Sequence, residues 1–225
     1  MNLMEKIFIF DLDGTIIDAY DAIVESMNYT LQRLNYPAAD ALLITRSVGA
    51  GNDGLMRAFF REPDVPTARE VYRQHHKTHL TGRIRLLPGA LDLLQSLKKQ
   101  RKILAVASNR PADTALLLLE TLEITGLFDR ILTGEEVPRP KPAPDILLAL
   151  LREFRCLPEE ALYFGDMTID GKTGAAAGVK TVLVATGSST RQEIEAERPF
   201  LVIGSLPEFP AAYQAASGKN PARRR

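Results

Sequence analysis

The chain has 225 residues, of which 45% are hydrophobic and 25% are charged, and this composition excludes a disordered or collagen-like protein. Lysine and arginine total 28, as do aspartate and glutamate, so the net charge of zero argues against nucleic acid or an anionic membrane as partner. The single cysteine, Cys156, excludes an internal disulfide and favours a reducing compartment. No apolar stretch reaches ~18 residues, so we expect a cytoplasmic protein without a membrane anchor.

Short apolar runs alternate along the chain with segments of helical periodicity. Strands are predicted at residues 7–10, 103–107, 130–133, 162–164 and 181–184, with a weaker one at 200–203. Helices are predicted between them at residues 91–99, 113–122, 145–154 and 168–177. This alternation is typical of βαβ units and predicts an α/β fold with a mostly parallel sheet.

One segment, residues 18–85, interrupts this alternation with helical patterns and no convincing strand. Apolar residues recur at helical spacing from Ile23 to Leu34, and further helices are expected near residues 55–60 and 71–80. The pair Pro88-Gly89 then marks the return to the α/β body. We therefore predict a core of residues 1–17 and 86–225 and a small helical cap of residues 18–85.

Acidic residues follow two of the predicted strands. Asp11 and Asp13 come directly after the first strand, and Asp166 and Asp170 follow the strand at 162–164. Ligands of open α/β sheets bind outside the carboxyl ends of the strands, so these four carboxylates are expected in one crevice. Their mutual repulsion calls for a cation, and oxygen ligands suit Mg²⁺.

Two further polar motifs lie between the acidic pairs. Lys141 stands between Pro140 and Pro142, where a rigid backbone can aim its charge, although an exposed loop lysine would look the same. Ser108-Asn109 follows another strand and, taken alone, reads most simply as the cap of the next helix.

The order Asp-x-Asp-Gly-Thr, Ser-Asn, Lys-Pro and Gly-Asp-x-x-x-Asp resembles the haloacid dehalogenase superfamily of phosphohydrolases, in particular its members with a helical cap. The resemblance implies a doubly wound, Rossmann-like core. It also implies that Asp11 is the nucleophile, that Asp13 is the general acid and base, and that catalysis passes through an aspartyl-phosphate.

The same resemblance implies the remaining site residues. Magnesium would be held by Asp11, Asp166 and the backbone carbonyl of Asp13, and Asp170 would either bind the ion directly or orient the groups that do. Catalysis would also use Ser108 and Lys141, and the amides near Leu12 and Asn109 would hold phosphate oxygens. Met167 stands where the family often has a small hydroxyl residue, a departure that affects the surroundings of the metal.

Within the predicted cap, the segment from Arg46 to Gly51 is similar to the cap signature of phosphoglycolate phosphatases. This similarity favours 2-phosphoglycolate as substrate, with Arg46 as a carboxylate partner and Gly49 and Gly51 near the substrate. The alternative is that the glycines only form a tight connection between helices. His75, His76 and His79 are expected on a solvated helix face rather than at a metal.

Several other functions stay open at this point. Pyrophosphate, sugar phosphates and nucleotides are alternative substrates, and a hexose-phosphate mutase is an alternative activity of the same superfamily. A catalytically inactive phosphate-binding regulatory protein is the alternative from another class, whereas a receiver domain would be about half this length and lack the insertion. We expect a small phosphorylated metabolite as partner and a monomer or homodimer.

Overall fold

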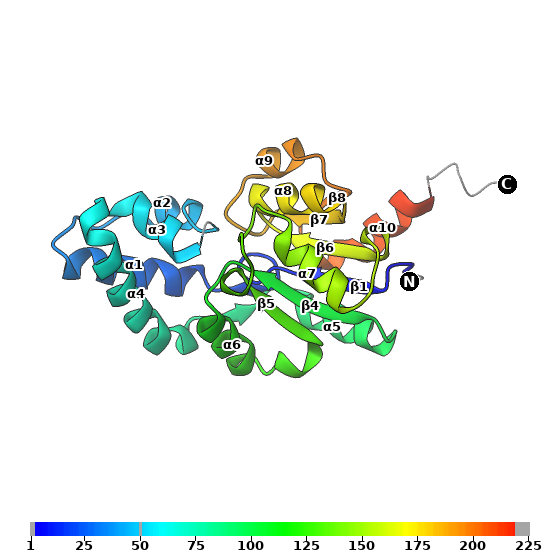
Figure 1. Ribbon diagram of the computed structural model, residues 1–225, viewed down its shortest axis with the longest axis horizontal. Coiled ribbons are helices and arrows are strands. Elements are labelled where there is room, and N and C mark those ends of the chain that lie inside the picture. The colour runs from blue at the N-terminus through cyan, green and yellow to red at the C-terminus, as the bar shows by residue number, and fades with distance from the viewer. Residues whose placement is uncertain (1–2, 50, 219–225) are drawn as a thin grey trace.

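The centre of the protein is a six-stranded sheet in which every pairing is parallel (Figure 1). The computed structural model describes residues 3–49 and 51–218. The strands lie in the order β5-β4-β1-β6-β7-β8. Their bounds are β1 Ile7–Phe10, β4 Ile103–Ser108, β5 Arg130–Thr133, β6 Ala161–Gly165, β7 Lys180–Val184 and β8 Leu201–Ile203.

Alternate residues of the buried strands face opposite layers of helices. Phe8 and Phe10 of β1 belong to a core that includes residues of three helices, α5 Ala90–Lys99, α6 Ala112–Thr121 and α10 Phe209–Gly218. Ile7 and Ile9 belong to a second core shared with α7 Asp145–Glu153 and α8 Thr168–Ala177. Side chains alternate across a strand, so helices cover both faces and the expected doubly wound α/β fold is confirmed.

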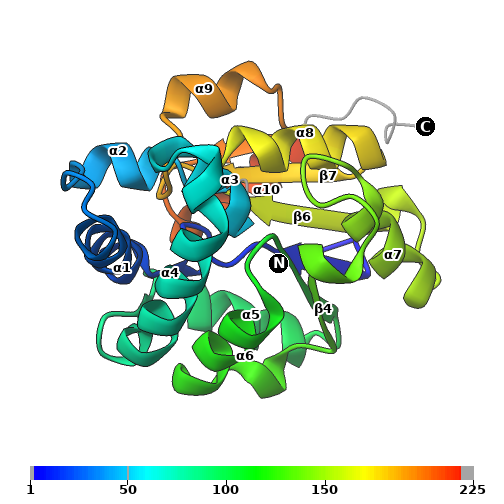
Figure 2. The same ribbon diagram turned by 60° about the vertical axis from the view of Figure 1, so that its left-hand side comes forward.

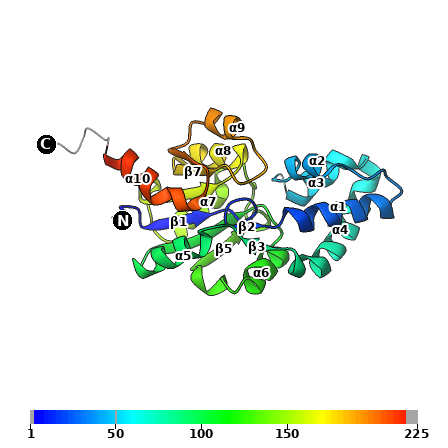
Figure 3. The ribbon, with the colours of Figure 1, turned by 180° about the vertical axis from the view of Figure 1, so that it is seen from behind.

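The inserted segment forms helices at one end of the molecule (Figures 2 and 3). They are α1 Tyr20–Arg33, α2 Ala41–Arg46, α3 Gly51–Phe59 and α4 Val65–His79, and they enclose a separate apolar core. A short antiparallel pair, β2 Ile17–Asp18 and β3 Arg85–Leu86, connects these helices to the sheet. The boundary between core and cap at residues 17 and 86 stays a prediction; strand β2 lies at the first boundary and strand β3 at the second.

The structure contains short elements that the apolar pattern did not predict. These are α2, the strands β2 and β3, and a six-residue helix, α9 Arg191–Ala196; the longer helix α10 was not predicted either. Helix α4 begins at Val65, six residues before the predicted start, with Pro66 in its first turn where proline is tolerated. Among the described residues, no helix is both long and apolar enough to cross a membrane.

Candidate active site

The first acidic motif forms a tight loop after the central strand. Asp11 directly follows β1, and its backbone amide donates to the carbonyl of Phe164 in β6 at 2.9 Å. Gly14 adopts a φ of 76°, and a Cβ there would lie 2.5 Å from Oδ2 of Asp166. Glycine therefore lets this loop turn and approach the second acidic motif closely.

Asp11, Asp166 and Asp170 are all buried, and one oxygen from each lies within 4.8 Å of the other two. Burial raises the pKa of Asp11 to about 6, with Lys141 lowering it and Asp170 raising it. Burial, followed by the charges of Asp170 and Asp11, holds the pKa of Asp166 well above its usual range. Crowded carboxylates in a dry environment are costly when ionised, and a cation would relieve that cost.

Lys141 enters this cluster from the proline-rich loop and is almost fully buried. Its Nζ lies 3.1 Å from Oδ1 of Asp11 and 2.7 Å from Oδ1 of Asp170, and it donates to the hydroxyl of Tyr163 at 3.1 Å. Burial lowers the pKa of Lys141, but the two carboxylates outweigh this and keep its pKa above the usual range. A charged ammonium therefore stands beside Asp11.

Asp170 uses both carboxylate oxygens within the protein. Its Oδ1 accepts from Nζ of Lys141 at 2.7 Å and from the hydroxyl of Tyr163 at 2.6 Å. Its Oδ2 accepts from the backbone amides of Asp166 at 3.2 Å and Met167 at 3.1 Å. Four donors occupy the lone-pair directions of this carboxylate, so its principal contacts are with the lysine and the loop.

The donor set fits a divalent cation. Three carboxylates face one lysine in the cluster, which leaves an excess of negative charge. Oδ1 of Asp11 is buried and, apart from its ion pair with Lys141, has no hydrogen bond. Mg²⁺ takes oxygen ligands of this kind. The side chain of Asp13 lies outside this group, and the expectation for Asp13 concerned its backbone carbonyl, so the structure brings together the three aspartate side chains expected near the metal.

The carboxylate of Asp13 instead pairs with Arg110, a residue that the sequence analysis did not select. Nε and Nη2 of Arg110 donate to the two oxygens of Asp13 at 2.8 Å and 2.7 Å. Its Nη1 lies 2.9 Å from Nε2 of His76 in α4. Burial lowers the pKa of Arg110, but the ion pair with Asp13 raises it by more than burial lowers it, so the pKa lies above its usual range.

The expectation that His76 lies on a solvated helix face is wrong. His76 is buried, stacks on Tyr72, and its Nδ1 lies 3.1 Å from the hydroxyl of Ser26. Tyr72, His76 and Leu80 are buried at four-residue spacing, and this spacing was the available signal for a buried face. His79 is exposed as expected, whereas His75 is half-buried.

The predicted phosphate-binding residues lie around the acidic cluster. The amide side chain of Asn109 accepts from the backbone N–H of Lys141 at 3.0 Å and donates to its carbonyl at 3.0 Å. It also donates to the carbonyl of Gly49 at 3.0 Å, so Asn109 links the core to the inserted helices rather than capping α6. Oγ of Ser108 accepts from the amide of Arg110 at 3.3 Å, and Leu12 directly follows Asp11 with its side chain buried in the core.

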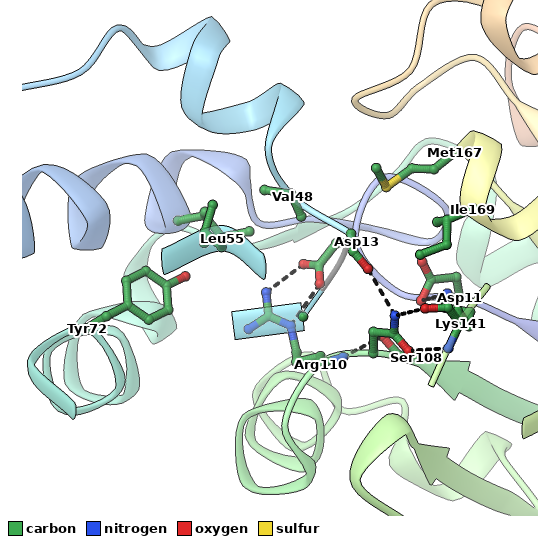
Figure 4. A pocket seen from close by; sticks show the side chains of 14 residues that line it. Asp11, Asp13, Val48, Leu55, Tyr72, Ser108, Arg110, Lys141, Met167 and Ile169 are labelled. Atoms are coloured by element: carbon green, nitrogen blue, oxygen red, sulfur yellow. Dashed lines mark hydrogen bonds and ion pairs between the residues drawn. The ribbon is translucent and has the colours of Figure 1, made fainter. Parts of the chain in front are cut away.

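These residues surround a pocket between the sheet and the inserted helices, with a volume of about 60 Å³. Figure 4 shows Arg110, Ser108 and Lys141 on the side of the sheet and Leu55 and Tyr72 on the opposite side. The described lining residues are Asp11, Asp13, Ile23, Val48, Gly49, Gly51, Leu55, Tyr72, Ser108, Asn109, Arg110, Lys141, Met167 and Ile169.

The cap residues expected near the substrate separate into two groups. Gly49 and Gly51 line the pocket, and a Cβ on Gly49 would lie 2.5 Å from Cε of Met167. Arg46 lies outside the lining residues, partly exposed at the end of α2, with Nη2 2.6 Å from Oε1 of Glu193. In this structure Arg46 therefore pairs with Glu193 at the surface and does not line the pocket.

Known proteins resemble the chain over most of its length. A curated phosphoglycolate phosphatase of Aquifex aeolicus is 30% identical over 182 residues, which are 81% of this chain and 85% of the relative. Another phosphoglycolate phosphatase, from Pseudomonas putida, is 29% identical over 216 residues, 90% of this chain and 78% of the relative. The solved structure of a predicted phosphoglycolate phosphatase from Haemophilus somnus superposes with a TM-score of 0.89 at 26% identity, covering 94% of this chain and 99% of the other.

The family comparison covers the same region. The model of the family described as haloacid dehalogenase-like hydrolase matches residues 8–184, which include both acidic motifs, Lys141 and the inserted helices. The predicted resemblance and fold class are thereby confirmed. The chain belongs to the haloacid dehalogenase-like hydrolases.

Proposed function

We propose that this protein hydrolyses a small phosphomonoester in a Mg²⁺-dependent reaction, with 2-phosphoglycolate as the best candidate substrate. The observation that carries this proposal is the buried cluster of Asp11, Asp166 and Asp170 beside Lys141 at a small pocket. The relatives called phosphoglycolate phosphatases support the choice of substrate. A hydrolase of this family needs a nucleophile, a positive charge and an acid near the phosphate; Asp11 and Lys141 supply the first two, and Asp13 supplies the third.

Asp11 and Asp166 are the side chains best placed to hold Mg²⁺, together with the backbone carbonyl of Asp13. Asp170 orients Lys141 and the loop at Asp166, since all of its lone-pair directions are used. When bound, the ion supplies positive charge that offsets the repulsion between a phosphate dianion and the carboxylates.

Asp11 attacks phosphorus, and the bond between phosphorus and the ester oxygen breaks as the aspartyl-phosphate forms. Asp13 donates a proton to the departing alkoxide and later takes one from the water that attacks the aspartyl-phosphate. That second step releases inorganic phosphate and regenerates Asp11. A covalent intermediate divides one difficult displacement into two easier ones.

The remaining polar groups position the phosphate. The ammonium of Lys141 lies 3.1 Å from Asp11, where it attracts the incoming phosphate oxygens. Ser108 and the backbone amides at Leu12 and Asn109 bind the other oxygens in this proposal. Phosphoryl transfer depends mainly on such positioning and electrostatic stabilisation, so these groups account for much of the rate.

The inserted helices, residues 18–85, act as a cap that selects the substrate. They supply Ile23, Val48, Leu55 and Tyr72 to the pocket wall. The side chains of Ile23, Val48 and Leu55 offer no polar partners for the hydroxyls of a sugar, which favours a short ester over a nucleotide or a hexose phosphate. The substrate is thus a small phosphorylated metabolite, and we place the enzyme in the cytoplasm as a monomer or homodimer.

Phosphate release from a panel of substrates tests this proposal. The panel contains 2-phosphoglycolate, pyrophosphate, a sugar phosphate and a nucleoside monophosphate, each with and without Mg²⁺, and Asp11→Asn serves as the blank. We expect Mg²⁺-dependent release from 2-phosphoglycolate that the variant lacks. Equal release by Asp11→Asn would refute the nucleophile, and no release from any substrate would refute the hydrolase assignment in favour of a mutase or a binding role.

A further inference from the structure

Arg110 has a geometry that the proposed chemistry does not yet use. Its guanidinium lines the pocket, and two of its nitrogens bind both oxygens of Asp13 at 2.7 Å and 2.8 Å (Figure 4). This is the paired arrangement in which arginine recognises a carboxylate of any origin. The pair is nearly enclosed, with 6% of the arginine side chain and 12% of the aspartate side chain exposed.

The ion pair with Arg110 competes with the proposed role of Asp13 as general acid and base. Both of its oxygens face Arg110, so the ester oxygen of a substrate has to compete with the guanidinium for them. If Asp13 turns away, Arg110 is left as a buried cation without its partner, which is strongly unfavourable. Release of Asp13 therefore requires another anion at Arg110.

The composition of the pocket indicates what that anion is. Among the described residues that line it, Arg110 and Lys141 are the basic ones, and Lys141 is engaged by Asp11 and Asp170. The surrounding walls of Ile23 and Leu55 are apolar. A short ester with a carboxylate one carbon from the ester oxygen would bring that carboxylate to the region where Asp13 works.

We propose that Arg110 recognises the carboxylate of the substrate, which replaces the carboxylate of Asp13 on the guanidinium and frees Asp13 to face the ester oxygen. This inference rests on the proposed function and narrows it to phosphate esters of short hydroxy acids. Binding of the correct substrate is thereby coupled to the release of Asp13, the general acid and base, from Arg110.

His76 keeps the guanidinium in position during this exchange. Its Nε2 lies 2.9 Å from Nη1 of Arg110, and its Nδ1 lies 3.1 Å from the hydroxyl of Ser26. Burial, and then the charge of Arg110, lowers the pKa of His76 to about 3, so the ring is neutral and accepts from the arginine. Because His76 belongs to helix α4, a cap residue positions the core arginine that we propose binds the substrate carboxylate.

Two matched substrates test the proposal. 2-Phosphoglycolate carries the carboxylate, and 2-hydroxyethyl phosphate has an uncharged alcohol in its place. We expect wild-type kcat/KM to favour the carboxylate by on the order of 100-fold, as for other paired contacts of arginine with a carboxylate. Arg110→Gln should reduce this preference to a few-fold by lowering kcat/KM for 2-phosphoglycolate while sparing or raising it for the alcohol.

Two further variants separate recognition from a general structural role. Arg110→Lys keeps the charge without the paired geometry and should recover part of the preference, even if Arg110→Gln folds poorly. Arg57→Gln alters an exposed cap arginine paired with Glu62 and should leave the preference unchanged. Equal losses for both substrates in the Arg110 variants, or a wild type without the preference, would overturn the inference. Absence of phosphate release by the wild type would instead overturn the proposed function.

Discussion

The buried His76 predicts a specific dependence of stability on pH. Its pKa is lowered from 6.5 to about 3, first by burial and then by the charge of Arg110, while Asp13 opposes the shift. The folded protein thus binds fewer protons than the unfolded chain between these values, and its stability must fall as the pH drops below 6.5. Between pH 7 and pH 5 this one group removes about 2 kcal/mol from the free energy of unfolding.

Urea unfolding at pH 7 and pH 5 measures this effect in the wild type and in His76→Gln. The glutamine amide can accept from Arg110 but does not titrate, so the variant should lose about 2 kcal/mol less than the wild type. Groups common to both proteins, including Asp11 and His75, cancel in the difference. His79→Gln alters an exposed histidine of the same helix and should behave as the wild type does. Equal losses in wild type and His76→Gln would refute the claim that the fold keeps His76 neutral.

Three further predictions concern the acidic cluster. Lys141→Met leaves two buried carboxylates without their cation, so it should lower the free energy of unfolding without added metal by about 3 kcal/mol and abolish phosphate release. Asp166→Asn should weaken the Mg²⁺-induced rise in Tm that we expect for the wild type, as measured by thermal unfolding with and without Mg²⁺. Gly187→Ala should weaken it too, because its Cβ would lie 1.6 Å from Oδ2 of Asp166, whereas Gly126→Ala, in open space, should not.

Much of the core could be predicted because it repeats a simple pattern. The five better strands and four of the core helices were predicted close to their positions, since each buried strand is a short apolar run bounded by turn residues. Two-residue strands such as β2 and β3 have no periodicity to detect. Helices α2 and α9 have only six residues each, and the signals for them in the sequence are local caps, Asp40 for α2 and the capping box of Thr190 and Glu193 for α9.

The site also contains residues that could be predicted from the sequence and residues that only the structure shows. Asp11, Asp166 and Lys141 could be selected because they follow strands or stand in a distinctive motif, and the topology then brings them together. Arg110 follows such a motif too, but its partner Asp13 is 97 residues away, so only the folded chain shows the pair. A sequence gives no indication of which way an arginine at a helix end points, and in the structure Arg46 pairs with Glu193 at the surface.

The contacts between cap and core differ in how strongly they constrain the site. The surface pairs of Arg46 with Glu193 and of Arg73 with Asp113 are partly exposed, and such pairs contribute between about 0 and 1 kcal/mol. The contact of His76 with Arg110 is buried, and each partner would lose a hydrogen bond without regaining water if the other were removed. The position of the cap above the reacting groups is therefore governed mainly from inside the pocket, where the same guanidinium also binds Asp13. Under the exchange proposed above, the carboxylate of the substrate would act on that inner contact directly.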